Sequence, residues 1–253
     1  MAYLSSEVRN KINHDERIKY KRENWGRVKG GYSSSGNKLV IKIPEFNEEL
    51  SEFLGIMFGD GNSYFKRGYK IGIYAVRITG DSRYDKPYLG IFVNHLVENL
   101  FGLKGKISYP KHGNVIVISF YSIKLIQKLN ELGFPPGDKI KNKLKIPEWI
   151  KSNQIFYKAF IRGLIDTDGS IFRMSNQDPQ LLRISLTNFI PDLLDEIRNG
   201  LIDMGFNPSK IICNKHFYLS RKDNITKYIK EIGFSNSKHI NRLKILQNQS
   251  PVV

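Results

Sequence analysis

The chain has 253 residues and a formal net charge of +16, because 40 lysines and arginines outnumber 24 aspartates and glutamates. This basic excess favours a polyanionic partner, most often nucleic acid, over a basic protein without one. A 40% apolar content is ordinary for a globular protein, and no apolar run approaches the roughly 20 residues of a membrane helix. The chain has a single cysteine and no signal-peptide pattern. We therefore expect an intracellular protein, cytoplasmic or organellar and not secreted.

Residues 1–46 are predicted to form a polar, basic arm separate from the rest. Within it only Leu39–Ile43 has the pattern of a strand, which Pro44 ends. Two interpretations remain open for the arm. It is either an extra nucleic-acid contact, with Trp25 and Tyr32 as stacking residues, or a leader or part of an adjoining host protein.

Residues 47–138 are predicted to form a first repeat. It begins with a helix capped by Asn47 and ending at Gly59-Asp60-Gly61, and it continues through two hairpins and two further helices. The expected elements are strands at 63–70 and 71–79, a helix at 88–101, strands at 104–109 and 115–121, and a helix at 123–132.

Residues 153–253 repeat this order after a linker at 139–152, whose first part also ends the first copy. The chain therefore predicts a duplicated αββαββα unit. The expected elements are a helix at 155–166, strands at 170–174 and 181–187, a helix at 190–204, short strands at 210–213 and 217–221, and a helix at 225–232.

Two similar apolar runs lie at the start of the repeats. They read FLGIMFGDG at 53–61 and IRGLIDTDG at 161–169, and they are offset by 108 residues. Each has small residues four apart, which lets two helix backbones approach closely. If the two helices pack about a pseudo-two-fold axis, Asp60 and Asp168 meet at that axis.

One Asp-Gly dipeptide alone would indicate an ordinary turn. Two carboxylates brought together repel each other, however, and one of them would stay protonated unless a cation lay between them. Oxygen ligands and water suit Mg²⁺, with Mn²⁺ as a substitute. Next to a phosphate, such a cation activates water and stabilises the departing oxygen. The pair therefore predicts a metal-dependent, DNA-cutting site.

Both runs resemble the LAGLIDADG motif of homing endonucleases of the single-chain, two-motif type, and the second run is the closer match. The resemblance implies a monomeric α/β (α+β) fold with pseudo-two-fold symmetry, in which the motif helices form the internal interface and two antiparallel sheets form a DNA-binding saddle. It also implies site-specific, metal-dependent cleavage of both strands of a long double-stranded DNA target, with short 3′ overhangs, by a protein encoded within an intron or intein.

The same resemblance implies roles for individual residues. The motif acids become shared metal ligands, the preceding residues offer backbone carbonyls to flanking metals, and a lysine after the last helix of each repeat lies near the scissile phosphates. These positions are Asp60 and Asp168, then Gly59 and Thr167, then Lys139 and Lys238. The equally paired Lys145 and Lys244 are the alternative lysines, and plain phosphate contact is the alternative role.

The first repeat departs from the motif at two positions. Phe58 replaces the first motif acid, which is not the usual metal ligand. Gly80 stands where a polar side chain often orders water, whereas the second repeat has Asn188 there. Unequal cleavage of the two strands is therefore expected.

The concave faces of the strands are expected to contact DNA, through base edges or phosphates. Because strand side chains alternate between faces, about half of the candidates should face the core instead. The candidates are Tyr64, Lys66, Arg67, Lys70, Tyr74, Arg77, Arg173, Asn176, Gln177 and Arg183.

Three alternatives to a nuclease remain open. The first is a maturase that binds its host intron RNA, and the second is a catalytically silent DNA-binding regulator on the same fold. The third is a nucleotide-binding enzyme, faintly suggested by the glycines at 55, 59 and 61, but such a loop should follow a strand and this one ends a helix.

Overall fold

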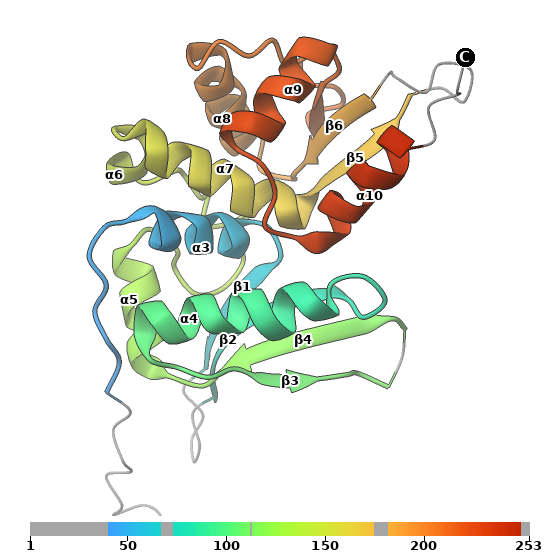
Figure 1. Ribbon diagram of the computed structural model, residues 1–253. Helices are drawn as coiled ribbons and strands as arrows, with labels where there is room; N and C mark the ends of the chain where they lie inside the picture. The colour runs from blue at the N-terminus through green and yellow to red at the C-terminus, as the bar shows by residue number, and fades with distance from the viewer. Residues whose placement is uncertain (1–39, 67–72, 112, 175–181, 249–253) are drawn as a thin grey trace, which may run out of the picture. The chain divides into compact units, whose positions relative to one another are not determined.

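The structure is a computed structural model that describes residues 40–66, 73–111, 113–174 and 182–248. Apart from Val40, the described residues belong to one compact unit, Ile41–Val253. The unit is built around two helices, α3 (Glu48–Phe58) and α7 (Gln154–Asp168), which lie side by side. In Figure 1 the C-terminal ends of both helices point to the right.

Both central helices begin at an asparagine whose side chain accepts hydrogen bonds from the first turn. Asn47 Oδ1 accepts from the Leu50 amide at 2.8 Å. Asn153 Oδ1 accepts from the amides of Ile155 and Phe156 at 2.9 and 3.3 Å. These caps satisfy amides that have no partner inside a helix, so both helix starts are encoded locally.

The first repeat places helices against a four-stranded antiparallel sheet with strand order β1-β2-β4-β3. The helix expected over 88–101 is present, but its first part is a π-helix. After α3, the elements are β1 (Gly61–Lys66), β2 (Ile73–Asp81), the π-helix η1 (Tyr88–Val93), α4 (Asn94–Phe101), β3 (Lys106–Ser108), β4 (Val115–Phe120) and α5 (Ile123–Glu131).

The second repeat has a three-stranded antiparallel sheet with order β5-β6-β7. The short helix α6 (Glu148–Lys151) precedes it. After α7 come β5 (Gly169–Arg173), β6 (Leu182–Thr187), α8 (Pro191–Asp203), β7 (His216–Leu219), α9 (Lys222–Glu231) and α10 (Ser237–Asn248).

The predicted α+β fold, with two antiparallel sheets and the motif helices between the repeats, is confirmed (Figure 1). Apolar side chains from both repeats form one continuous core, which includes Phe53, Phe58 and Phe160. In the described part of the chain, no helix is long and apolar enough to cross a membrane.

Two predicted strands are wrong. Residues 40–43 form no strand, because the Lys42 amide bonds to the carbonyl of Phe101 at the end of α4 and not to a neighbouring strand. The strand expected at 210–213 is reduced to a single bridge between Ile212 and His216. Cys213 and Asn214 both have positive φ, so the chain reverses too tightly there to extend a hairpin.

Helix α10 is the main element that sequence reasoning missed. The two repeats are similar in sequence here, yet residues 139–143 form turns and 144–147 are irregular, whereas the equivalent part of the second repeat is a 12-residue helix. This helix packs along β5, the edge strand of the three-stranded sheet (Figure 1). Arg173 Nη2 donates to the carbonyl of Leu246 at 2.6 Å and ties the two elements together.

Candidate metal and nucleic-acid site

The two central helices meet backbone to backbone at a pair of glycines. A Cβ added at Gly55 would collide with the carbonyl of Phe160, and a Cβ added at Gly163 would collide with the carbonyl of Glu52. Gly55 and Gly163 are 108 residues apart, and so are Glu52 and Phe160. The contacts therefore repeat about a pseudo-two-fold axis, and the predicted packing of the motif helices is confirmed.

The C-terminal ends of the helices are equally close. A Cβ added at Gly59 would collide with Thr167 and would lie 3.4 Å from Cγ of Asp168. The hydroxyl of Thr167 turns back to donate to the carbonyls of Gly163 and Leu164, at 3.1 and 2.9 Å. Asp168 thus lies beside the end of α3, where Asp60 follows Gly59.

Asp60 is exposed to solvent, yet many protein atoms surround it. This desolvation, together with the nearby charge of Asp168, raises the pKa of Asp60 to about 7. Lys139 and Lys238 oppose the shift but do not cancel it. The arrangement is therefore short of positive charge for two ionised carboxylates.

Asp168 has a partner that Asp60 lacks. Nδ2 of Asn188 donates to Asp168 Oδ2 at 2.8 Å, and Asn188 Oδ1 accepts from the amide of Ile190 at 3.0 Å. Burial raises the pKa of Asp168, whereas the bond from Asn188 lowers it. The equivalent position near Asp60 is Gly80, so the predicted difference between the repeats is present in the structure.

Lys139 and Lys238 both lie close enough to act electrostatically on Asp60. Nζ of Lys139 donates to the carbonyls of Phe58, at 3.1 Å, and of Gly59. Burial lowers the pKa of Lys139. Lys238 instead forms an ion pair with Asp85, with Nζ 2.9 Å from Oδ1. The two lysines therefore have different partners despite their equivalent places in the repeats.

The alternative lysines, Lys145 and Lys244, are exposed and are not among the main charges that act on Asp60 or Asp168. Their placement favours Lys139 and Lys238 as the pair beside the acids.

The oxygen atoms gathered here suit a hard divalent cation. They are the carboxylates of Asp60 and Asp168, with the backbone carbonyls of Gly59 and Thr167 at the same helix ends. The described residues contain no group of three or more His, Cys, Asp or Glu side chains that could hold a metal. A cation would therefore need main-chain carbonyls, water or a substrate phosphate to complete its coordination.

A buried polar network surrounds Asp166, the first acid of the second motif. Asp166 is fully buried and accepts hydrogen bonds from the amides of Ser235 and Asn236, at 2.7 and 3.0 Å. Burial raises the pKa of Asp166 to about 8. In the first repeat Phe58 occupies this position and packs against Phe160 and Phe134. The first motif acid therefore serves as a structural cap in one repeat and is replaced by core packing in the other.

The strand register divides the candidate DNA contacts of the first sheet. Tyr64 pairs with Ala75 and Asn62 pairs with Arg77, so Tyr64, Lys66 and Arg77 share one face. Tyr74 lies on the opposite face and packs against the core. The candidates Arg67 and Lys70 lie outside the described residues.

The second sheet divides its candidates in the same way. Arg183 pairs with Phe172 on the face opposite to Ile171 and Ile184, and its guanidinium lies 4.3 Å from the centre of the Tyr218 ring. Arg173 lies on the other face, where it is bound to α10. Asn176 and Gln177 are outside the described residues.

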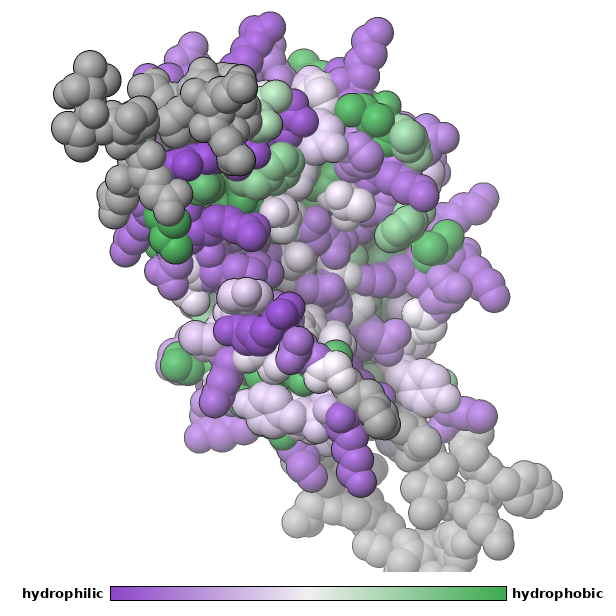
Figure 2. Space-filling view, turned by 90° about the vertical axis from the view of Figure 1, so that its right-hand side faces the viewer, coloured by the Kyte–Doolittle hydropathy of each residue, from purple (hydrophilic) through white to green (hydrophobic). Residues whose placement is uncertain are grey.

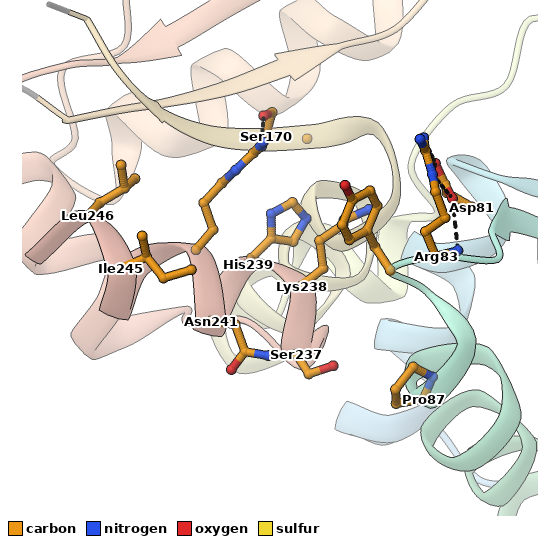
Figure 3. A pocket seen from close by; sticks show the side chains of 13 residues that line it. Asp81, Arg83, Pro87, Ser170, Ser237, Lys238, His239, Asn241, Ile245 and Leu246 are labelled. Atoms are coloured by element: carbon orange, nitrogen blue, oxygen red, sulfur yellow. Dashed lines mark hydrogen bonds and ion pairs between the residues drawn. The ribbon is translucent and has the colours of Figure 1, made fainter. Parts of the chain in front are cut away.

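A cavity of about 630 Å³ opens between the loop after β2 and α10 (Figure 3). Arg83 and its partner Asp81 lie on one side of it, Ser170 of β5 borders it, and α10 contributes Lys238, His239 and Leu246. Figure 2 shows the surface toward which the C-terminal ends of α3 and α7 point in Figure 1, and hydrophilic side chains predominate there.

Comparison with known proteins agrees with this geometry. Residues 156–233, which span most of the second repeat, match the family described as LAGLIDADG-like domain. The chain contains a LAGLIDADG-like domain. Its fold also matches the homing endonuclease I-DmoI, with a TM-score of 0.51, 23% identity, and coverage of 74% of this chain and 95% of that one.

A structure of I-DmoI in complex with DNA and Mn gives the same TM-score at 24% identity, and covers 74% of this chain and 97% of that one. These likenesses establish the duplicated LAGLIDADG fold. The two runs that resemble the LAGLIDADG motif lie on α3 and α7 and end at Asp60-Gly61 and Asp168-Gly169.

In two sequence relatives, the match is confined to a short segment of a much longer protein. One is the replication factor C small subunit of Methanocaldococcus jannaschii, 25% identical over 84% of this chain but only 11% of its own length. The other is an A-type ATP synthase subunit of Pyrococcus horikoshii, 34% identical over 52% of this chain and 12% of its own length. This chain thus spans about a tenth of the length of these two relatives.

Asp85 and Asn236 were not identified from the sequence. Asp85 lies in a loop before Pro87, outside either motif, and only the fold brings it to Lys238. Asn236 lies in the repeated stretch after Gly233, where its equivalent in the first repeat is a proline. This difference between the two repeats was the sequence feature that could have pointed to Asn236.

Proposed function

We propose that this chain is a site-specific endodeoxyribonuclease that makes a metal-dependent double-strand break in a long DNA target and leaves short 3′ overhangs. The observation that carries the proposal is the meeting of Asp60 and Asp168, one from each repeat, at the ends of the paired helices with Lys139 and Lys238 beside them. One copy of the chain supplies both halves of this site, so the proposed active form is a monomer.

The raised pKa values of the two acids support a metal. A carboxylate pair that is desolvated and only partly compensated by lysines gains most from a divalent cation. In this proposal Asp60, Asp168 and the carbonyls of Gly59 and Thr167 hold Mg²⁺, with Mn²⁺ as a substitute. When bound, the metal supplies activation of water and stabilisation of the departing oxygen.

Other side chains of the protein bind the DNA and orient the reacting groups. Lys139 and Lys238 bind and orient the phosphates nearest the acids through their positive charge. Asn188 holds one carboxylate oxygen of Asp168, which fixes the orientation of that carboxylate. Tyr64, Lys66, Arg77 and Arg183 lie on the strand faces that would follow the duplex, where they position phosphates or read bases.

The two long relatives support an origin as an inserted element. Replication factor C and the ATP synthase have unrelated names and functions, yet each of the two relatives contains a short segment that resembles this chain. A segment shared by unrelated proteins is independent of what those proteins do. An element encoded within an intron or intein has this property, and a break at a defined DNA site is the activity that would spread it.

The testing experiment incubates the purified chain with a randomised duplex library and Mg²⁺, and then sequences the cut ends. The expected result is one recurrent long site with a short 3′ stagger. Asp60→Asn and Asp168→Asn should each abolish cutting and keep duplex binding, because an amide is a poorer metal ligand of the same shape. Asp223→Asn on the exposed start of α9 is the matched control and should cut normally.

Other outcomes identify the alternatives. Tight duplex binding without cutting in Mg²⁺ or Mn²⁺ would overturn the nuclease proposal in favour of a silent DNA-binding regulator. Preference for structured intron RNA over duplex DNA, again without cutting, would favour the maturase.

A further inference from the structure

Lys238 of the second repeat is held by a carboxylate from the first repeat. Asp85, in the loop between β2 and η1, is only 6% exposed, and its Oδ1 lies 2.9 Å from Lys238 Nζ. We propose that Asp85 is a positioning residue of the cleavage site, which holds Lys238 beside Asp60 and substitutes for the side chain missing at Gly80. This inference rests on the proposed nuclease function.

Three donors converge on the Asp85 carboxylate. Oδ2 accepts from the amide of Asp81 at 2.9 Å. Oδ1 accepts from Nδ2 of Asn236 at 2.9 Å and from Lys238. A buried carboxylate with hydrogen bonds from both sides is fixed in place, so its ion-pair partner is fixed too. Both oxygens are engaged, which makes Asp85 a holder of lysine and leaves it poorly suited to be a metal ligand.

Asp85 also fills the space that a side chain at Gly80 would occupy. A Cβ at Gly80 would lie 2.9 Å from Asp85 Cβ and 3.1 Å from Asp85 Oδ2. In the second repeat Asn188 fills the equivalent place and bonds directly to Asp168. The first repeat therefore places the carboxylate of Asp85 there and pairs it with Lys238. An ion pair thus holds a lysine at one half of the site, whereas a hydrogen bond holds the motif acid at the other.

The position of Asp85 relative to the acids gives this difference a functional meaning. The charge of Asp85 acts on Asp60, and so does the charge of Lys238. Among the described residues, Lys139 forms no ion pair with a carboxylate and instead donates to the carbonyls of Phe58 and Gly59. Losing Asp85 should therefore misplace one lysine and leave the other, which predicts a defect confined to one strand.

The experiment measures nicking of each strand separately on the duplex recovered from the library, with the two strands labelled differently. Asp85→Asn keeps the shape and removes the charge. It should slow one strand by roughly 10- to 100-fold, the range expected when a group near the reaction is displaced. Lys238→Met should slow the same strand. Asp223→Asn makes the same change on the exposed start of α9, so it is the matched control and should leave the strand ratio unchanged.

A double variant separates positioning from a merely structural role. If Asp85 acts through Lys238, adding Asp85→Asn to Lys238→Met should not change the strand ratio further. Equal slowing of both strands by Asp85→Asn, or additive effects in the double variant, would overturn the inference. Asp85→Ser, whose hydroxyl can still accept from the Asp81 amide, replaces Asp85→Asn if thermal unfolding shows that the asparagine variant does not fold.

A measurement without cleavage keeps this inference separate from the proposed function. Limiting acetic anhydride followed by mass spectrometry compares acetylation of Lys238 with that of exposed Lys244 in the same molecule. Lys238 should be the less reactive in the natural chain and should approach Lys244 in Asp85→Asn. Equal reactivity of Lys238 in both proteins would sink the inference even if the chain cuts DNA. If Lys238 is protected from acetylation but the chain does not cut DNA, only the proposed nuclease function is contradicted.

Discussion

Gly55 of α3 faces the carbonyl oxygen of Phe160 in α7 with no room for a side chain between them. Gly55→Ala should therefore force the helices apart and lower the free energy of unfolding by about 1–3 kcal/mol or more, the range for overpacking a core. Thermal unfolding measures this effect. Gly90→Ala is the control, because its Cβ would meet only the tip of the Ile107 side chain, at 3.3 Å. Equal melting temperatures for the two variants would contradict the close helix contact.

Divalent-metal binding should depend on pH through Asp60. Because the pKa of Asp60 is raised to about 7, its proton competes with the metal below that pH. Affinity for Mn²⁺ should rise about tenfold from pH 6 to pH 8, as the ionised fraction of one such group rises. Calorimetric titration at both pH values measures it. Asp60→Asn should bind weakly at both, and an affinity that does not change with pH in the natural chain would argue against Asp60 as a ligand.

The stability of the fold should fall as pH rises toward 8, in part because of Asp166. Its folded-state pKa of about 8 exceeds the ordinary value of 3.8, so between these pH values the folded chain keeps a proton that the unfolded chain has lost. This contribution is complete below the unfolded pKa and disappears as pH passes the folded pKa. Asp166→Asn cannot titrate, so its melting temperature should fall less between pH 5 and pH 9. A slope as steep as that of the natural chain would exclude Asp166 as a source.

Unequal cleavage of the two strands remains a prediction, but the structure changes its test. A side chain added at Gly80 alone, as in Gly80→Gln, should mainly lower the stability of the fold, because its Cβ would press on Asp85 and on Leu89 at 3.0 Å. Gly80→Asn combined with Asp85→Gly removes the closest of these atoms, the Asp85 Cβ at 2.9 Å, so the double variant should melt above Gly80→Asn. Thermal unfolding of both variants checks this order, and the reverse order would show that Asp85 does not occupy that space.

The strand faces predict which basic residues bind DNA. Arg77→Ala removes a charge from the exposed face of the first sheet, so duplex affinity should fall and the slope of log affinity against log salt should shrink by about 1. Binding titrations at several salt concentrations measure both. Lys230→Ala on exposed α9 makes the same change of charge away from that face and should leave the slope unchanged. Equal effects would mean that only net charge matters.

The fold could be predicted from the sequence because short, local sequence patterns determine its main features. The asparagine caps, the glycines four apart and the constant offset of 108 residues each constrain the chain directly, and they sufficed to place Asp60 beside Asp168. The same alternation that defined the strands also separates Arg77 from Tyr74, although the sequence alone could not tell which of the two faces the core.

Contacts that depend on tertiary structure were out of reach. Asp85 meets Lys238 across 153 positions of sequence, and nothing local marks either residue as a partner of the other. Helix α10 was missed for a similar reason, because its equivalent in the first repeat begins Lys139-Ile-Lys and stays in turns. The packing of α10 along β5 distinguishes the two outcomes, and that packing exists only once the sheet has formed.

The ammonium group of Lys139, seated on the carbonyls of Phe58 and Gly59, gives the helix ends a counter-ion that is covalently part of the chain. Folding of the two halves therefore does not have to wait for a divalent ion, and a chelator should leave the melting transition largely intact. In the proposed site, a divalent ion bound by the Gly59 carbonyl would have to displace the ammonium group of Lys139 from it. The folded protein would then exist with or without the ion, and its activity would follow the supply of metal.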